Sequence, residues 1–152
     1  MRSFLLLLHL SGVIIWIGGM FFAHFCLRPV AALQLQPPQR LPLLAAVLGR
    51  FFKAVALSIV AILGSGFASM AMMGFAHAPV HWHVMSGLGI VMAAIFGVIY
   101  FLFFPRLKAG VADENWPVAG AAMNRIRQLV LTNLLLGAAT IVVATLGANL
   151  AR

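Results

Sequence analysis

Four long apolar runs dominate the pattern of this chain, and polar residues gather between them. The runs span residues 4–27, 54–75, 83–104 and 129–150. An α-helix rises 1.5 Å per residue, so each run is long enough to cross the roughly 30 Å of a bilayer's hydrocarbon. The alternating segments of about ten residues that mark a membrane barrel do not occur. The pattern predicts an all-α integral membrane protein with one four-helix transmembrane domain over residues 1–152.

The composition agrees with a membrane protein and adds a packing signal. Hydrophobic residues make up 64% of the chain and charged residues 8%, against about 45–50% and 25% in soluble domains. Small residues, which let helix backbones approach closely, occur in every span. They predict a compact antiparallel four-helix bundle whose interior can hold a cofactor, and exposed small-residue faces would also permit a homodimer. These residues are Gly12, Gly18, Gly19, Gly64, Ser65, Gly66, Ser69, Gly87, Gly89, Gly97, Gly137, Ala138, Ala144 and Gly147.

The positive charges are placed asymmetrically between the spans. Four lie in the first connection and four in the third, whereas the second connection has none. The positive-inside rule therefore places both basic connections in the cytoplasm and both termini on the periplasmic side of a bacterial inner membrane. The net charge of +8 then reflects topology and attraction to the lipid bilayer, and not nucleic-acid binding. The basic residues are Arg28, Arg40, Arg50, Lys53, Arg106, Lys108, Arg125 and Arg127.

The two basic connections carry signals of their own. Residues 34–39 contain two prolines and end the first helix, and residues 41–52 are expected to form a separate amphipathic segment at the inner surface. Residues 113–115 supply helix caps, and Pro117 suits a first helical turn. We therefore expect the fourth helix to begin well before its apolar run.

Several chemistries are excluded by the scarcity of acidic residues. Asp113 and Glu114 are the only carboxylates and are adjacent, so a separated acid–base pair cannot form. A Ser-His-Asp triad lacks its buried aspartate. With a single cysteine, Cys26, an internal disulfide cannot form either.

Histidines inside apolar spans are the strongest hint of chemistry, because ionisable groups in hydrocarbon usually bind or pair with something. His9 shares a helical face with Trp16, and His83 opens the third span. In the predicted topology both lie at similar depth, where two imidazoles could ligate a haem iron or one transition metal. Trp16 and Trp82 would then pack against the macrocycle. Alternatively, His9 hydrogen-bonds a carbonyl and His83 reaches the headgroups.

A second cluster lies at the connection between the second and third spans. Its thioethers suit Cu(I), and its imidazoles suit copper in either state. Ordinary packing is the competing interpretation, since methionine is common in apolar helices. His77 or His81 could also replace His83 as the second haem ligand. The cluster comprises Met70, Met72, Met73, His77, His81 and Met85.

Several segments resemble known membrane proteins. Residues 7–12 with 15–22 are similar to the first helix of the copper-resistance D (CopD)-like family, and distantly to the HemJ type of protoporphyrinogen oxidase. Residues 82–85 resemble a Trp-Leu-His-x-Lys stretch of the HemJ type. Residues 124–127 leading into 133–137 resemble the fourth-helix opening of small CopD-like proteins.

The resemblance implies a b-type haem site that uses His9, with His83 as its partner. Met85 stands where the HemJ type has a lysine, which argues against protoporphyrinogen oxidase activity. The leading hypothesis is thus an inner-membrane haem b protein, a membrane oxidoreductase that passes electrons between a quinone or small oxidant and a periplasmic redox partner. The alternative is a CopD-type protein that handles or transports copper through its Met/His cluster, and a structural assembly subunit is a third hypothesis.

Overall fold

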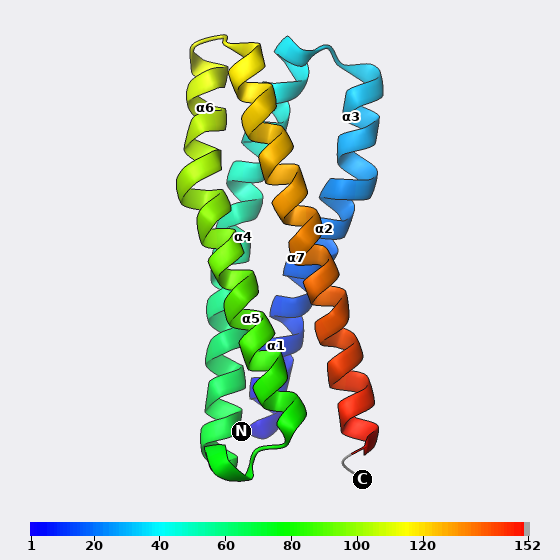
Figure 1. Cartoon of the computed structure of the whole chain (residues 1–152), viewed down its shortest axis with the longest axis vertical. Coiled ribbons are helices and arrows are strands. Elements are labelled where there is room, and N and C mark those ends of the chain that lie inside the picture. Colours follow the sequence, from blue (N-terminus) through cyan, green and yellow to red (C-terminus); the bar gives the residue numbers. More distant parts are fainter. Residues whose placement is uncertain (151–152) are drawn as a thin grey trace.

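Four long helices account for nearly all of the chain in the computed structural model, which describes residues 1–150 (Figure 1). Each helix is long and apolar enough to cross a membrane, which confirms the predicted all-helical fold class. Their bounds are Arg2–Gln34, Pro37–Met73, Val80–Ala112 and, as far as side chains are described, Trp116–Ala148. Large apolar side chains such as Phe4, Leu57 and Phe101 are exposed on the outer faces, as expected for contact with a lipid bilayer.

Two of these helices contain π-helical turns. The first consists of α1 (Arg2–Val13), α2 (Gly19–Phe21) and α3 (Arg28–Gln34), joined by π-helical turns at Ile14–Gly18 and Phe22–Leu27. The second is α4 (Pro37–Met73), followed by a 3₁₀ turn at Phe75–His77. The third consists of α5 (Val80–Val98) and α6 (Phe104–Ala112) around a π-helical turn at Ile99–Phe103, and the fourth is α7 (Trp116–Leu150).

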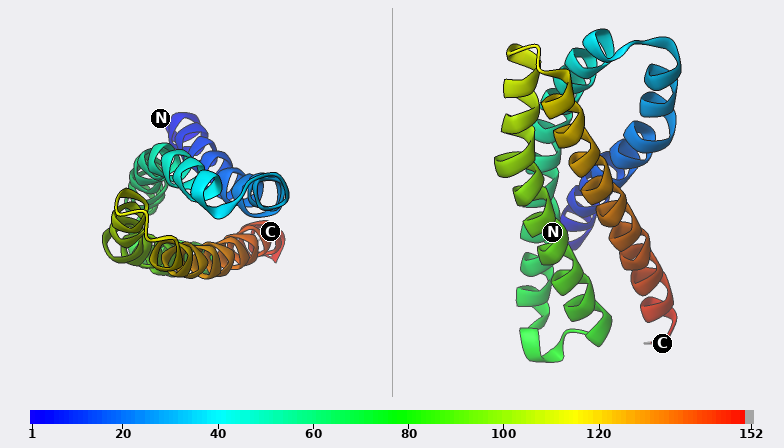
Figure 2. Two further views of the ribbon diagram at one scale, coloured as in Figure 1. Left: turned by 90° about the horizontal axis from the view of Figure 1, so that it is seen from above. Right: turned by 45° about the horizontal axis from the view of Figure 1, so that its top comes forward.

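The helices follow one another around an arc. α1 packs on α4, α4 contacts α5, and both α5 and α6 pack on α7 (Figure 2). Figure 1 shows the start of α1, the end of α7 and residues 74–79 at one end of the molecule, here called the terminal end. The connections at residues 35–36 and 113–115 lie at the opposite end, here called the basic end. The first helix meets α7 through α2 and the following π-helical turn, and α1 lies farther along, toward the terminal end.

The segment 41–52 does not form the separate surface helix that we expected. It is a continuous part of α4, which begins at Pro37 with proline in its first turn. Leu41, Leu44, Leu48 and Phe52 are all buried. Their helical spacing places them on one face that packs into the core, so the amphipathic pattern reflects burial against neighbouring helices.

The core occupies the middle and the basic half of the bundle. Phe52 lies at its centre and makes edge contacts with the rings of Phe96 and Phe104, at centroid distances of 5.7 and 5.1 Å. The predicted start of the fourth helix is confirmed. The Asn115 side chain accepts a hydrogen bond from the Val118 N–H at 3.3 Å, so Asn115 caps the first turn of α7.

Candidate functional site

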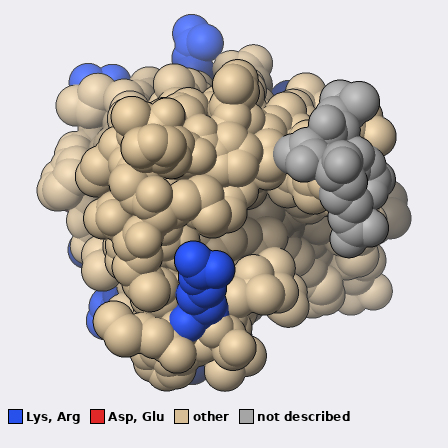
Figure 3. Space-filling model, turned by 90° about the horizontal axis from the view of Figure 1, so that it is seen from below, with Lys and Arg blue, Asp and Glu red and all other residues tan. Residues whose placement is uncertain are grey.

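A cavity of about 610 Å³ lies toward the terminal end, with walls from α1, α4, α5 and α7. Figure 3 views the molecule from this end and shows the hollow. Its volume falls in the range of about 300–1,000 Å³ that is typical of small-molecule and cofactor sites. Most of its wall is apolar, and the polar side chains that line it are Arg2, His9, Ser69, Ser86, Thr140 and Thr145.

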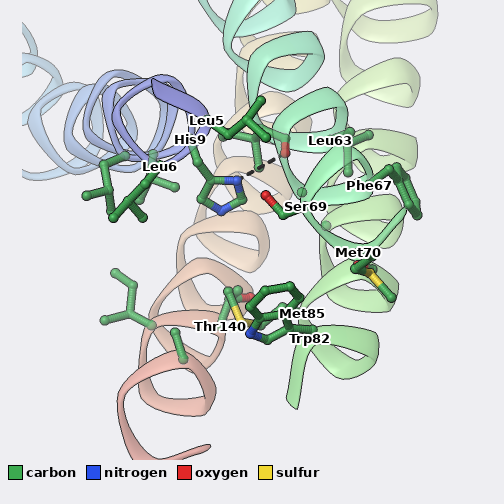
Figure 4. A pocket seen from close by; sticks show the side chains of 18 of the residues that line it. Leu5, Leu6, His9, Leu63, Phe67, Ser69, Met70, Trp82, Met85 and Thr140 are labelled. Carbon is green, nitrogen blue, oxygen red and sulfur yellow. Dashed lines mark hydrogen bonds between the residues drawn. The ribbon is translucent and has the colours of Figure 1, made fainter. Parts of the chain in front are cut away.

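His9 projects from α1 into this cavity, and its ring is held by α4 (Figure 4). Its Nδ1 atom lies 3.1 Å from the Ile62 carbonyl oxygen and 3.0 Å from Ser65 Oγ. A carbonyl oxygen can only accept, so in the neutral ring Nδ1 carries the proton and donates it. The Ser65 hydroxyl donates in turn to the Ala61 carbonyl at 2.6 Å, which leaves its lone pairs free to accept from His9.

This arrangement leaves the other ring nitrogen, Nε2, without a proton. Among the described residues no hydrogen bond engages His9 Nε2, so its lone pair is available to a ligand. Metal-binding histidines generally donate their second ring N–H to a carbonyl or similar acceptor, which sets the tautomer and orients the ring. Gly66 lies beside the ring, where a Cβ would make ordinary van der Waals contact with His9 Cε1 at 3.7 Å. His9 therefore has the geometry of an oriented ligand.

Both tryptophans that the sequence singled out line the same cavity as His9. Trp16, from the first helix, is buried. Trp82, from α5, is half-buried and lies across the cavity from His9 (Figure 4). One imidazole and two large aromatic side chains therefore line the same cavity.

His83, predicted as the second iron ligand, lies elsewhere. It is exposed, its Nε2 atom lies 3.2 Å from the Phe75 carbonyl oxygen, and it does not line the cavity. Successive helical residues point about 100° apart, so Trp82 faces the cavity and its neighbour His83 does not. The structure therefore brings His9, Trp16 and Trp82 together without His83.

The proposed copper cluster divides in the same way. Its four methionines, Met70, Met72, Met73 and Met85, all line the cavity with His9. Its two histidines do not. His77 is exposed on the 3₁₀ turn. His81 packs against α7, where a Cβ added to Gly147 would clash with the His81 Cβ.

Some residues of the site were not predicted from the sequence. Met92 adds a buried methionine to the wall, and Ser86 donates a hydrogen bond to the Met70 sulfur at 3.3 Å. Ser65 was noted only as a small packing residue, yet it contacts His9 from a position 56 residues away. Within the described residues, no group of three or more His, Cys, Asp or Glu side chains could hold a metal ion. A metal in this cavity would therefore depend on thioethers beside the single imidazole.

Comparison with known proteins identifies the family. No curated protein and no solved structure matches the chain. The sequence model of a family described as "Copper resistance protein D" matches residues 45–146, a segment that includes the cavity methionines but not His9. This match covers more than half of the chain and runs through three of its four apolar helices, and on that ground the chain belongs to the copper resistance protein D family.

Proposed function

We propose that this chain is a multi-pass protein of the bacterial inner membrane that binds Cu(I) in the terminal-end cavity and thereby takes part in copper handling or transport. The observation that carries the proposal is the set of side chains that line the terminal-end cavity. An imidazole with a free Nε2 lone pair and several methionine side chains line the same cavity.

The ligand chemistry favours a soft, singly charged metal. Thioethers select Cu(I), and imidazole binds copper well, whereas Mg²⁺ and Ca²⁺ require oxygen ligands. The only two carboxylates of the chain, Asp113 and Glu114, follow α6 at the basic end. A neutral imidazole and neutral thioethers also add no charge to an apolar environment, which suits a site within a membrane. The residues that would hold the ion are His9 with Met70 and Met85.

The direction of access follows from the positive-inside rule. The basic end would face the cytoplasm, so the terminal end, both termini and the cavity would face the periplasm in an antiparallel bundle. On its inner side the cavity meets Trp16 and Met92, which are buried members of the core. The cavity would therefore receive copper from the periplasmic side and hold it above a packed core.

Cu(I) binding to the purified protein tests this proposal directly. Competition with a chromogenic Cu(I) chelator under anaerobic conditions should show one tight site, weakened more than about 100-fold by His9→Ala, since loss of an outer-shell partner alone costs 10–100-fold. Met70→Leu with Met85→Leu should weaken it too, with little change in packing volume. Met123→Leu and His77→Ala are matched controls. Met123 lines a small cavity at the basic end, and His77 is exposed outside the terminal-end cavity. Equal affinity in all variants would refute the proposal.

A haem b redox protein is the second candidate, and the cavity itself favours it. Its volume and the two tryptophans suit a flat aromatic cofactor, and His9 could ligate the iron through Nε2. With His83 outside the cavity wall, a methionine such as Met85 would hold the haem together with His9, a His/Met pairing known in cytochromes. Bound haem b would supply one-electron redox chemistry between a quinone and a periplasmic partner.

The absorption spectrum of the protein separates the two candidates. Protein expressed with ample haem and purified in detergent should show a Soret band that sharpens with dithionite if haem is resident, and His9→Ala should abolish it. A featureless spectrum together with His9-dependent Cu(I) binding would reject haem and support copper handling.

A further inference from the structure

A second, smaller cavity lies at the basic end, remote from the copper site. It has a volume of about 40 Å³, opens between the first helix, α4 and α7, and is here called the groove. Three basic side chains line it, namely His24 and Arg28 from the first helix and Arg127 from α7. The rest of its wall is apolar and consists of Ala23, Leu27, Leu44, Leu48, Met123, Ile126 and Val130.

The positive charge at this groove is not balanced by the protein. The charged groups that act on His24 are Arg28 and Arg127, and those that act on Arg28 are Arg127 and Arg40, all of them cations. Within residues 1–148, none of the three basic side chains that line the groove makes a hydrogen bond to another protein group. Guanidinium groups that converge without an acidic partner repel one another unless an anion joins them. A bound anion would therefore relieve the repulsion between the cations at this groove.

We propose that this groove binds an anionic phospholipid, with the lipid phosphate between Arg28 and Arg127 and an acyl chain along the apolar wall. Guanidinium groups recognise phosphate oxygens through paired hydrogen bonds. Basic pockets between transmembrane helices on the cytoplasmic side are typical headgroup sites. The inference does not rest on copper or haem binding.

The lining of the cavity distinguishes a lipid from a soluble anion as the occupant. The cavity measures about 40 Å³, so it can take in a phosphate group but not a whole phospholipid. Seven of its ten lining residues are apolar, and an acyl chain is stabilised by contact with them whereas a free anion is not. The lipid phosphate would enter the cavity while an acyl chain lies against Ala23, Leu27 and Met123, which are partly exposed.

Native mass spectrometry of the detergent-purified full chain tests the site. Phosphatidylglycerol should bind more tightly than phosphatidylcholine. Each basic side chain near an anionic lipid contributes about five-fold in affinity, so Arg28→Gln with Arg127→Gln should weaken phosphatidylglycerol binding by about 25-fold. Arg50→Gln with Arg106→Gln removes the same charge from exposed positions outside the groove, and this control should change binding less than two-fold.

Two further variants keep the test decisive if the glutamine pair fails to fold. Arg28→Lys with Arg127→Lys keeps both charges but loses the paired guanidinium hydrogen bonds, so it should bind phosphatidylglycerol more weakly than the unmodified protein and more tightly than the glutamine pair. Ala23→Phe fills the apolar wall without changing charge and should weaken phosphatidylglycerol binding.

Three results would overturn the proposal. The first is an equal loss of binding in the groove pair and the control pair, which would indicate a diffuse surface charge. The second is unchanged binding in Ala23→Phe. The third is full displacement of phosphatidylglycerol by inorganic phosphate, which would indicate a site for free anions.

Discussion

The hydrogen bond from His9 to Ser65 should tune ligand affinity without taking part in ligation, and Ser65→Ala tests this. The chain offers a matched control in Ser58, two turns earlier on α4. Both hydroxyls donate to the carbonyl four residues before them, Ser65 to Ala61 at 2.6 Å and Ser58 to Ala54 at 2.9 Å. Both side chains are buried, with exposed fractions of 2% and 3%. Only Ser65 contacts His9.

The expected magnitude follows from the geometry of this contact. In Ser65→Ala the ring keeps its bond to the Ile62 carbonyl at 3.1 Å, so its tautomer survives and only one of two acceptors is lost. Interhelical side-chain hydrogen bonds in a membrane protein contribute about 0.6 kcal/mol on average, and about 1.7 kcal/mol at most. Ser65→Ala should therefore weaken Cu(I) binding by roughly 3-fold to 20-fold, through ring orientations in which Nε2 no longer faces the cavity. Ser58→Ala should leave the affinity unchanged.

The chelator competition described above measures this difference. Thermal unfolding of both variants in detergent measures the loss of the intrahelical bond that they share, and Ser65→Ala should lose up to about 1.7 kcal/mol more because it also loses the bond to His9. A difference in Cu(I) affinity between the two variants then reports on the contact with His9. If Ser65→Ala and Ser58→Ala bind Cu(I) equally while His9→Ala does not bind, Ser65 does not orient the ring and the reasoning is wrong.

Two other predictions concern stability. Gly110→Ala would place a Cβ 2.8 Å from the Ala119 backbone nitrogen. Because the backbone cannot rotate away, α6 and α7 must separate, and we expect the free energy of unfolding to fall by about 1–3 kcal/mol. The unfolding temperature should therefore be lower than that of Gly120→Ala, where a Cβ meets no described atom within 4 Å. Asn133 is buried and donates to the Met92 carbonyl at 3.1 Å, but its Oδ1 has no hydrogen-bond partner among the described residues. Asn133→Leu should therefore change the free energy of unfolding by less than about 1 kcal/mol, whereas Asn133→Asp, which buries an ionisable group, should cost several times more. A strong destabilisation by Asn133→Leu in the same unfolding measurement would contradict this.

The continuity of α4 shows where sequence reasoning stops. The pattern over 41–52 correctly indicates a helix with one apolar face, because the period of 3.6 residues is a local property. Whether that face meets a membrane surface or other helices depends on the partners that tertiary packing supplies. Here Leu41, Leu48 and Phe52 meet the core, so the segment joins α4.

The sequence by itself determined the four membrane-crossing helices and the inward face of the first one. In hydrocarbon every backbone polar group must be satisfied within the chain, so long apolar runs can only be helices. Helical spacing also places His9 and Trp16 on one face, and Gly12, Trp16 and Met20 are indeed buried. Only the tertiary structure decided the composition of the cavity. One residue along a helix turns a side chain by about 100°, so the rotation of α5 places Trp82 inside and His83 outside, and the crossing of α1 over α4 brings Ser65 to His9.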